Sequence, residues 1–161
     1  MITIKETTKN DLSSVQQLWA DGDVMKFVGF PEGLHETDEA MRRWMDRIEA
    51  ARPVTNHYSI FDDGVYCGEA FYQLDPKHGN SAALDIKLFR FARGKGIAAT
   101  ALSYAIGEAF KNGAEKVWVD PNPDNGKAIA LYERLGFERK PMPEYLIGEE
   151  GIVSIYMELV R

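Results

Sequence analysis

Residues that could bind an anion lie in a basic segment just past the middle of the chain. It reads Arg93-Gly94-Lys95-Gly96-Ile97-Ala98. Its glycines allow positive φ angles or a close approach to a ligand, and the first N–H groups of a following helix would lack partners. These donors, the helix dipole and the charges of Arg93 and Lys95 favour a phosphate or pyrophosphate. An ordinary glycine-rich turn is the alternative interpretation.

A candidate proton donor lies in a second segment, residues 120–137, which reads Asp-Pro-Asn-Pro-Asp-Asn-Gly-Lys-Ala-Ile-Ala-Leu-Tyr-Glu-Arg-Leu-Gly-Phe. Apolar residues from Ala128 to Leu135 recur at helical spacing, Gly136 can end that helix, and Asn125 lies at its start. A tyrosine has an ordinary pKa of about 10, so Tyr132 keeps its proton at neutral pH and can donate it. The alternative is an amphipathic side chain on the buried face of the helix.

Two aspartates are candidate bases. Asp85 alternates with Leu84 and Ile86 and should therefore project from the opposite face of a strand. There it could accept a proton from an ammonium group, directly or through water, or form a salt bridge with Lys87 or Arg90. Asp120 is the second candidate, although it could equally orient a cationic substrate or cap the proline-rich turn.

These residues depend on a strand that leads into a helix. Residues 84–89 alternate apolar and polar side chains, and Ile97, Ala101, Ala105 and Ala109 recur at helical spacing. The glycine-containing segment connects the two elements.

The flanking sequence predicts a mixed α/β domain. Thr37 should begin a helix that ends before Pro53 and packs its apolar face into the core. Asp-Gly at 63–64 favours a tight hairpin. Further strands are predicted at residues 2–7, 57–61, 65–74, 116–120, 137–140 and 152–160. Residues 21–36 contain Phe27 and Phe30, which could line a substrate cleft or belong to a short helix packed on the core.

Composition narrows the functional classes. The chain has 161 residues, a length typical of a single domain, and 45% of them are hydrophobic and 27% charged. A net charge of −6 argues against nucleic acid and is compatible with a cationic substrate. Cys67 is the one cysteine, so an intrachain disulfide is excluded, and no histidine has a partner at metal-ligand spacing. We expect no metal, no membrane contact and a cytoplasmic location.

Three nucleotide-binding patterns can be compared with the glycine-containing segment. A Walker A loop is absent, and Gly94, Gly96 and Ala99 match the Rossmann fingerprint only nominally because they lie past mid-chain. Arg93, Gly96 and Ala98 match Gln/Arg-x-x-Gly-x-Gly/Ala, which resembles the pyrophosphate loop of the GNAT superfamily of N-acetyltransferases. The spacing Asn-x-x-Ala-x-x-x-Tyr-x-x-x-Gly-Phe from Asn125 to Phe137 resembles the second motif of that superfamily.

The resemblance implies a fold and a set of site residues. It implies one domain over residues 1–161, with a mixed, mostly antiparallel sheet of about seven strands, helices on both faces, and acetyl-CoA between splayed fourth and fifth strands. The resemblance implies that the pyrophosphate of acetyl-CoA binds the backbone N–H groups of Arg93, Gly94, Lys95, Gly96, Ile97 and Ala98. It implies that the pantetheine arm runs along the strand edge at Leu88, Phe89 and Arg90, where the Leu88 N–H would lie near the thioester carbonyl. Asn125 would form a hydrogen bond with the same arm.

The same resemblance implies that Tyr132 is the general acid. Many members place a glutamate near the start of the fourth strand, where this chain has Ser81-Ala82-Ala83-Leu84, so Asp85 and Asp120 stay the candidates for the base. Asp120, Phe27 and Phe30 are the candidates for acceptor binding.

The sequence therefore predicts an acetyl-CoA-dependent N-acetyltransferase acting on a primary amine by direct attack. Residues 120–139 look like aminoglycoside 6'-N-acetyltransferases, whereas the N-terminal part looks like ribosomal-protein N-terminal acetyltransferases, so the acceptor is a small amine or a peptide N-terminus. A non-catalytic acetyl-CoA-binding module and a Rossmann-type oxidoreductase are the competing classes. A homodimer is an expectation from analogy alone.

Overall fold

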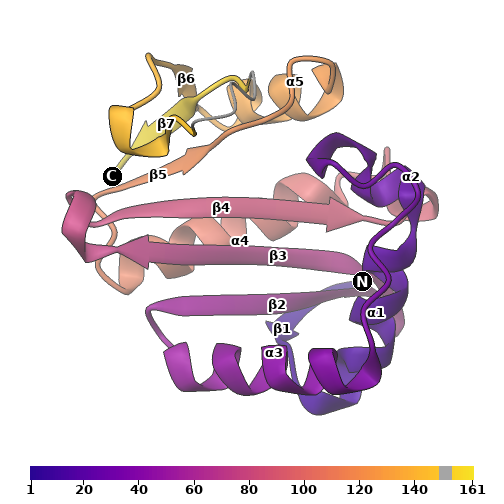
Figure 1. Ribbon diagram of the computed structural model, residues 1–161. Helices are drawn as coiled ribbons and strands as arrows, with labels where there is room; N and C mark the ends of the chain where they lie inside the picture. The colour runs from indigo at the N-terminus through magenta and orange to yellow at the C-terminus, as the bar shows by residue number, and fades with distance from the viewer. Residues whose placement is uncertain (149–153) are drawn as a thin grey trace.

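The computed structural model describes residues 1–148 and 154–161, which build a seven-stranded sheet flanked by helices (Figure 1). The strands are β1 (Ile2–Glu6), β2 (Thr55–Asp62), β3 (Val65–Asp75), β4 (Ser81–Leu88), β5 (Lys116–Val119), β6 (Glu138–Arg139) and β7 (Met157–Val160). The α-helices are α1 (Leu12–Ala20), α2 (Gly22–Met25), α3 (Asp38–Ala51), α4 (Ile97–Lys111) and α5 (Gly126–Arg134). Short 3-10 helices are η1 (Lys9–Asp11), η2 (Lys26–Val28), η3 (Pro76–His78), η4 (Arg90–Ala92) and η5 (Glu144–Leu146).

The sheet has the strand order β1-β2-β3-β4-β5-β7-β6. Within the described residues, β4 and β5 pair in parallel and every other neighbouring pair is antiparallel. This confirms the predicted mixed, mostly antiparallel sheet. It excludes the doubly wound Rossmann arrangement, which requires successive parallel strands.

Helices cover both faces of the sheet, as predicted. Helix α4 lies behind β3 and β4, whereas α1 and α3 lie in front of the sheet (Figure 1). Strand β4 shows why: its alternation sends Ala82, Leu84 and Leu88 into the core with α4, and Asp85 and Lys87 to the other face. The front face therefore carries polar side chains.

The parallel pair β4–β5 is joined for only a short distance. Residues Ser81–Ala83 pair with residues 116–118, and the two strands then separate. Strand β5 ends at Val119, and Pro121, two residues later, has no backbone N–H group with which the ladder could continue. The second half of β4, from Leu84 to Leu88, consequently borders a gap.

Several local predictions are confirmed. The hydroxyl of Thr37 caps α3, and the helix ends before Pro53. In the hairpin between β2 and β3, Asp63 has φ 48° and Gly64 has φ 83°, the positive values of a tight two-residue turn. Cys67 is a free, buried cysteine.

Other boundaries differ from the sequence prediction. Strand β4 begins three residues earlier than Leu84 and ends at Leu88, because the N–H of Ala92 bonds back to the carbonyl of Phe89 and closes a 3-10 turn. The predicted last strand begins at Ile152, which lies outside the described residues, and β7 begins at Met157. Residues 21–36 contain the short helix α2 with Met25 buried, which supports the second of the two interpretations offered for this segment.

Candidate active site

Three residues singled out from the sequence meet beside the gap between β4 and β5. Asp85 lies on β4, Asp120 directly follows β5, and Tyr132 is on α5. The negative charges of Asp85 and Asp120 both raise the pKa of Tyr132, and the charge of Asp85 also raises that of Asp120. The fold thus brings the candidate acid and both candidate bases into one electrostatic environment.

Tyr132 is buried on the inner face of α5, where its ring lies 5.7 Å from that of Phe137. Burial raises the pKa of its hydroxyl, and the charge of Asp85 followed by that of Asp120 raises it further. Because every contribution opposes ionisation, the hydroxyl holds its proton at neutral pH. That is the protonation state a general acid requires.

Asp85 forms the salt bridge that the sequence offered as one of two roles. Its Oδ2 accepts a hydrogen bond from Nζ of Lys87, two residues along the same face of β4. A carboxylate has acceptor sites on both oxygens, so this pairing leaves Oδ1 for another donor. Asp85 is also two-fifths exposed, which keeps it within reach of a ligand in the gap.

Asp120 occupies the opposite side of the gap. The residue reaches solvent, but the protein atoms around its carboxyl group raise its pKa, and the charge of Asp85 raises it further. A carboxyl group whose pKa is raised holds a proton more readily than an ordinary aspartate, which is a property that suits a base. Within the described residues, no ion pair neutralises Asp120.

The glycine-containing segment forms an open cradle at the start of α4. Gly94 and Gly96 have φ angles of 75° and 79°, and no atom lies within 4 Å of a Cβ built on either residue. Gly96 is the N-cap of α4 and supplies no side-chain cap to the first helical N–H groups. A pyrophosphate fits this arrangement because free N–H groups and the positive end of the dipole face one open space.

The side chain of Arg93 contributes differently from the sequence expectation that it adds charge for an anion. Its Nη2 donates to the carbonyl oxygen of Leu88 at 3.0 Å, and Nη1 binds Oδ2 of Asp23 at 2.9 Å. Arg93 therefore ties the end of β4 to α2 and fixes the cradle in place. Lys95 is exposed and remains the cation of the segment that can face a phosphate.

The strand edge predicted for a pantetheine arm is only partly present. Phe89 donates its N–H to the carbonyl of Cys67 on β3, so the alternate residue Leu88 directs its N–H to the β5 side, into the gap. Arg90 belongs to η4, and Phe89 also lies outside the strand. Of the three predicted residues, Leu88 is the one positioned on the open edge.

Asn125 and the two phenylalanines have additional or separate structural roles. Oδ1 of Asn125 accepts the N–H of Ala128 at 3.3 Å and caps α5, which leaves its amide N–H group as a donor. Phe27 lies under Nζ of Lys26, 5.2 Å from the ring centroid, and Phe30 is exposed. No contact found in the described residues joins either ring to Asp85, Asp120 or Tyr132.

Sequence reasoning missed a charged cluster buried behind Asp85. Glu69 on β3 is 4% exposed, accepts a 2.6 Å hydrogen bond from His57 and two of 3.0 Å from the indole N–H of Trp19, and lies 3.6 Å from Nζ of Lys87. Burial alone would raise the pKa of Glu69, but His57, Lys87 and Trp19 lower it to about 2. The one sequence signal was a glutamate inside an apolar strand.

Lys87 links this buried cluster to Asp85, one of the two candidate bases. Burial alone would lower the pKa of Lys87, yet the charges of Asp85 and Glu69 raise it above the ordinary value, so its ammonium stays charged. Lys87 therefore fixes the Asp85 carboxylate from one side while Glu69 fixes Lys87 from the other.

The described part of the chain lacks two further features. Among residues 1–148 and 154–161, no group of three or more His, Cys, Asp or Glu side chains is arranged to hold a metal ion. Within the same ranges, no helix combines the length and apolar character needed to span a bilayer.

Solved structures with closely similar folds are acetyltransferases. The spermidine N-acetyltransferase from Vibrio cholerae, in complex with CoA and spermine, has a TM-score of 0.81 at 19% identity, covering 99% of this chain and 95% of that one. The ribosomal-protein-alanine N-acetyltransferase from Brucella melitensis has a TM-score of 0.79 at 22% identity, with 99% of both chains covered. Aminoglycoside acetyltransferase AAC(6')-Ib, in complex with coenzyme A, has a TM-score of 0.78 at 18% identity, covering 100% of this chain and 95% of that one.

At these identities the likeness establishes the fold. No curated protein matches the sequence. The model of the acetyltransferase (GNAT) domain, however, matches residues 2–138, most of the chain and both sequence motifs up to Phe137. The protein therefore belongs to the GNAT family of acetyltransferases.

Proposed function

We propose that this GNAT acetyltransferase moves the acetyl group of acetyl-CoA to a primary amine by direct attack, with Asp85 as the base and Tyr132 as the acid. The observation that carries the proposal is the electrostatic interaction of Asp85, Asp120 and Tyr132 beside the point where β4 and β5 separate. Similar structures that contain CoA or acetyl-CoA support the choice of donor.

The residues of this chain would divide the work between binding and proton transfer. The backbone N–H groups of the cradle bind the pyrophosphate, and the Leu88 N–H polarises the thioester carbonyl. When bound, acetyl-CoA supplies the carbonyl carbon that is attacked and a thiolate leaving group. Asp85 accepts the amine proton as the C–N bond forms, and Tyr132 donates its proton to the sulfur as the C–S bond breaks.

Replacing the Tyr132 hydroxyl tests this assignment. Tyr132→Phe should lower kcat by about 10²-fold or more, since general acid catalysis contributes about 10²–10⁴-fold. Thiol release from acetyl-CoA with a panel of primary amines measures it. Tyr104→Phe is the matched control because Tyr104 is an exposed tyrosine on α4, on the far side of the sheet.

Two outcomes would contradict the proposal. Unchanged turnover in Tyr132→Phe would remove Tyr132 from the mechanism and favour another acid. Acetyl-CoA binding without transfer to any amine, together with indifference to Tyr132→Phe, would support the non-catalytic acetyl-CoA-binding module instead.

A further inference from the structure

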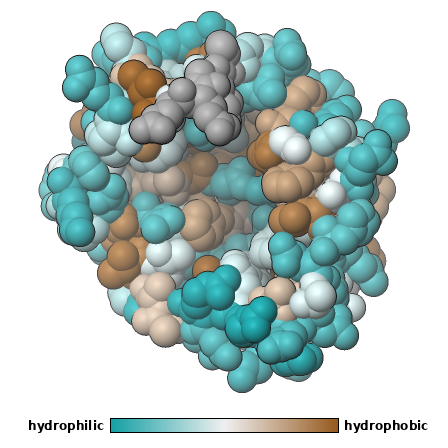
Figure 2. Space-filling view, in the orientation of Figure 1, coloured by the Kyte–Doolittle hydropathy of each residue, from teal (hydrophilic) through white to brown (hydrophobic). Residues whose placement is uncertain are grey.

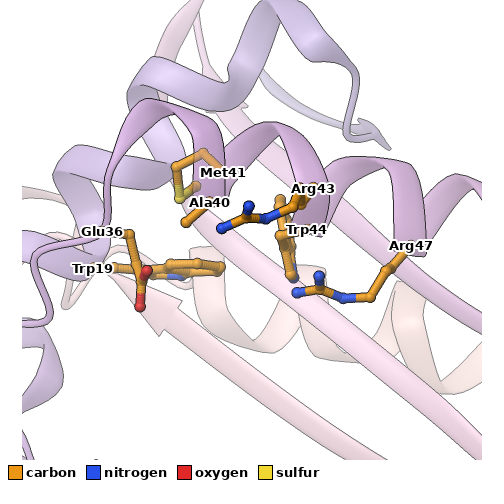
Figure 3. A pocket seen from close by; sticks show the side chains of 7 residues that line it. All are labelled: Trp19, Glu36, Ala40, Met41, Arg43, Trp44 and Arg47. Atoms are coloured by element: carbon orange, nitrogen blue, oxygen red, sulfur yellow. The ribbon is translucent and has the colours of Figure 1, made fainter.

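A pocket of about 290 Å³ opens on the front face of the molecule between α1 and α3 (Figure 3). Two indole rings form part of its wall, since Trp19 and Trp44 meet edge to face with centroids 4.9 Å apart. Arg43 and Arg47 extend from α3 on the same side as Trp44 (Figure 3). The pocket thus combines an aromatic wall with two guanidinium groups, the combination that suits an apolar chain ending in an anion.

The local charge of this pocket is opposite to that of the whole protein. Two arginines line it against one carboxylate, Glu36, while the chain carries a net charge of −6. Arg43 pairs with the exposed Glu39 at 3.0 Å, and pairs of this kind contribute little, so its guanidinium is free to turn to a ligand. Arg47 has no ion pair within the described residues. The side chains that line the pocket therefore carry a net positive charge.

Consecutive contacts connect the pocket to the reacting groups. The indole N–H of Trp19 is 3.0 Å from the carboxylate of Glu69, which is 3.6 Å from Nζ of Lys87, and Lys87 pairs with Asp85. All of these side chains lie on the front face of the sheet. Figure 2 shows that face hollowed near its centre. The Trp19 wall of the pocket and Asp85 therefore belong to one face of the sheet and to one chain of contacts.

We infer that this pocket is the acceptor's second subsite, and that the substrate class is a primary amine joined through an apolar chain to a carboxylate. The inference rests on the proposed function and narrows it. The carboxylate binds Arg43 and Arg47, the chain crosses the faces of Trp19 and Trp44, and the amine reaches Asp85. A polyamine or an aminoglycoside would instead place cationic groups against two guanidinium groups.

The test compares acceptors that differ only in the carboxylate. Straight-chain ω-amino acids of increasing length are paired with alkylamines of the same length, and thiol release gives kcat/KM for each. We expect the amino acid to exceed its paired alkylamine at the length that spans the pocket and Asp85. A peptide with an acidic side chain, paired with its amide analogue, tests whether the carboxylate belongs to a free amino acid or a peptide.

Substitutions on α3 test whether the guanidinium groups of Arg43 and Arg47 bind the carboxylate of the acceptor. Arg43→Gln and Arg47→Gln should each lower the ratio of amino-acid to alkylamine kcat/KM by about tenfold, mainly through KM, because a hydrogen bond between charged groups is lost. Arg42→Gln is the matched control, since Arg42 is an exposed arginine of the same helix outside the pocket. It should leave the ratio unchanged.

Binding can be measured separately from catalysis. An alkanoate of the optimal length, which lacks the amine, should change the tryptophan fluorescence of the wild type and do so much less in Arg47→Gln. Equal kcat/KM for amino acids and alkylamines, or a preference for polyamines, would overturn the subsite and leave the acetyl transfer intact. A protein that acetylates no amine and gains no thermal stability from acetyl-CoA would overturn both.

Discussion

The hydroxyl of Tyr132 determines the expected alkaline behaviour of the enzyme. Burial and the charges of Asp85 and Asp120 raise the pKa of this hydroxyl, so the proton that it donates in the proposed mechanism stays bound above the ordinary pKa of about 10. The acceptor amine must lose its own proton before it attacks. We therefore expect kcat/KM to rise with pH as the amine deprotonates and to show no descending limb below about pH 10.

Steady-state rates across the pH range measure this behaviour for wild type and Tyr132→Phe. A descending limb that falls below pH 10 in the wild type and disappears in Tyr132→Phe would mean that the hydroxyl ionises early. The raised pKa described for Tyr132 would then be wrong.

Glu69 should make the protein sensitive to acid. Its pKa is lowered to about 2 in the folded protein from 4.5, so its contribution to stability is complete above about pH 4.5 and is lost as the pH falls toward 2. Glu69→Gln should reduce the free energy of unfolding at pH 7 by about 3 kcal/mol or more, because His57 and Lys87 lose a buried partner.

Urea unfolding at several pH values measures this loss, which should shrink as the pH falls from 4.5. Glu49→Gln, at an exposed position on α3, serves as the control and should change little. A Glu69→Gln deficit that stays constant down to pH 2 would show that it does not arise from the carboxylate charge.

Individual residues were predictable where local spacing defined their surroundings. The alternation around Asp85 gave its face of β4, and the helical spacing around Tyr132 gave its buried position. Glu69 was not predictable, because its partners Trp19, His57 and Lys87 come from three other elements and only the assembled sheet brings them together.

At the scale of elements, Gly68 controls how closely β3 approaches β4. A Cβ at this position would collide with the carbonyl oxygen of Lys87 and press against Leu88. We expect Gly68→Ala to destabilise the protein by about 2–4 kcal/mol, since the obstacle is backbone and cannot rotate away. It should also lower activity, because the added methyl group would displace Lys87, whose ammonium group pairs with Asp85.

The same substitution at Gly107, within α4, should have the opposite effect on stability. It is exposed, and no atom lies within 4 Å of a Cβ built there. Gly107→Ala should stabilise the protein by about 0.5–1 kcal/mol through helix propensity alone. Chemical unfolding of both variants checks the pair, and equal effects would contradict the close approach at Gly68.

Most elements could be predicted from the sequence, whereas the spaces between them could not. Turn residues and alternation located the β2–β3 hairpin, and Thr37 and Pro53 bounded α3. The stripe on α3 was expected to be core. Met41 and Met45 are buried as expected, but Trp44 is only partly buried and lines the pocket, where its ring meets that of Trp19 on α1 edge to face.

At the scale of the whole molecule, acetyl-CoA should stabilise the folded state. A ligand at a hundred times its Kd adds about 2.7 kcal/mol by mass action, which for a chain of this size raises the unfolding midpoint by roughly 5–10 °C. Thermal unfolding with acetyl-CoA, CoA and NAD(P)H measures the effect. A shift with NAD(P)H and none with acetyl-CoA would contradict the proposed use of acetyl-CoA by this chain.

The short β4–β5 ladder divides this sheet into two groups of strands. β1 to β4 form one, β5, β7 and β6 form the other, and three residue pairs at one end connect them within the sheet. An occupant of the gap would bridge both groups, so the amides of β5 and β7 should exchange with solvent more slowly when it binds. The candidate site therefore lies where the two groups of strands separate, and a ligand bound there would add the contacts across the sheet that the short ladder lacks.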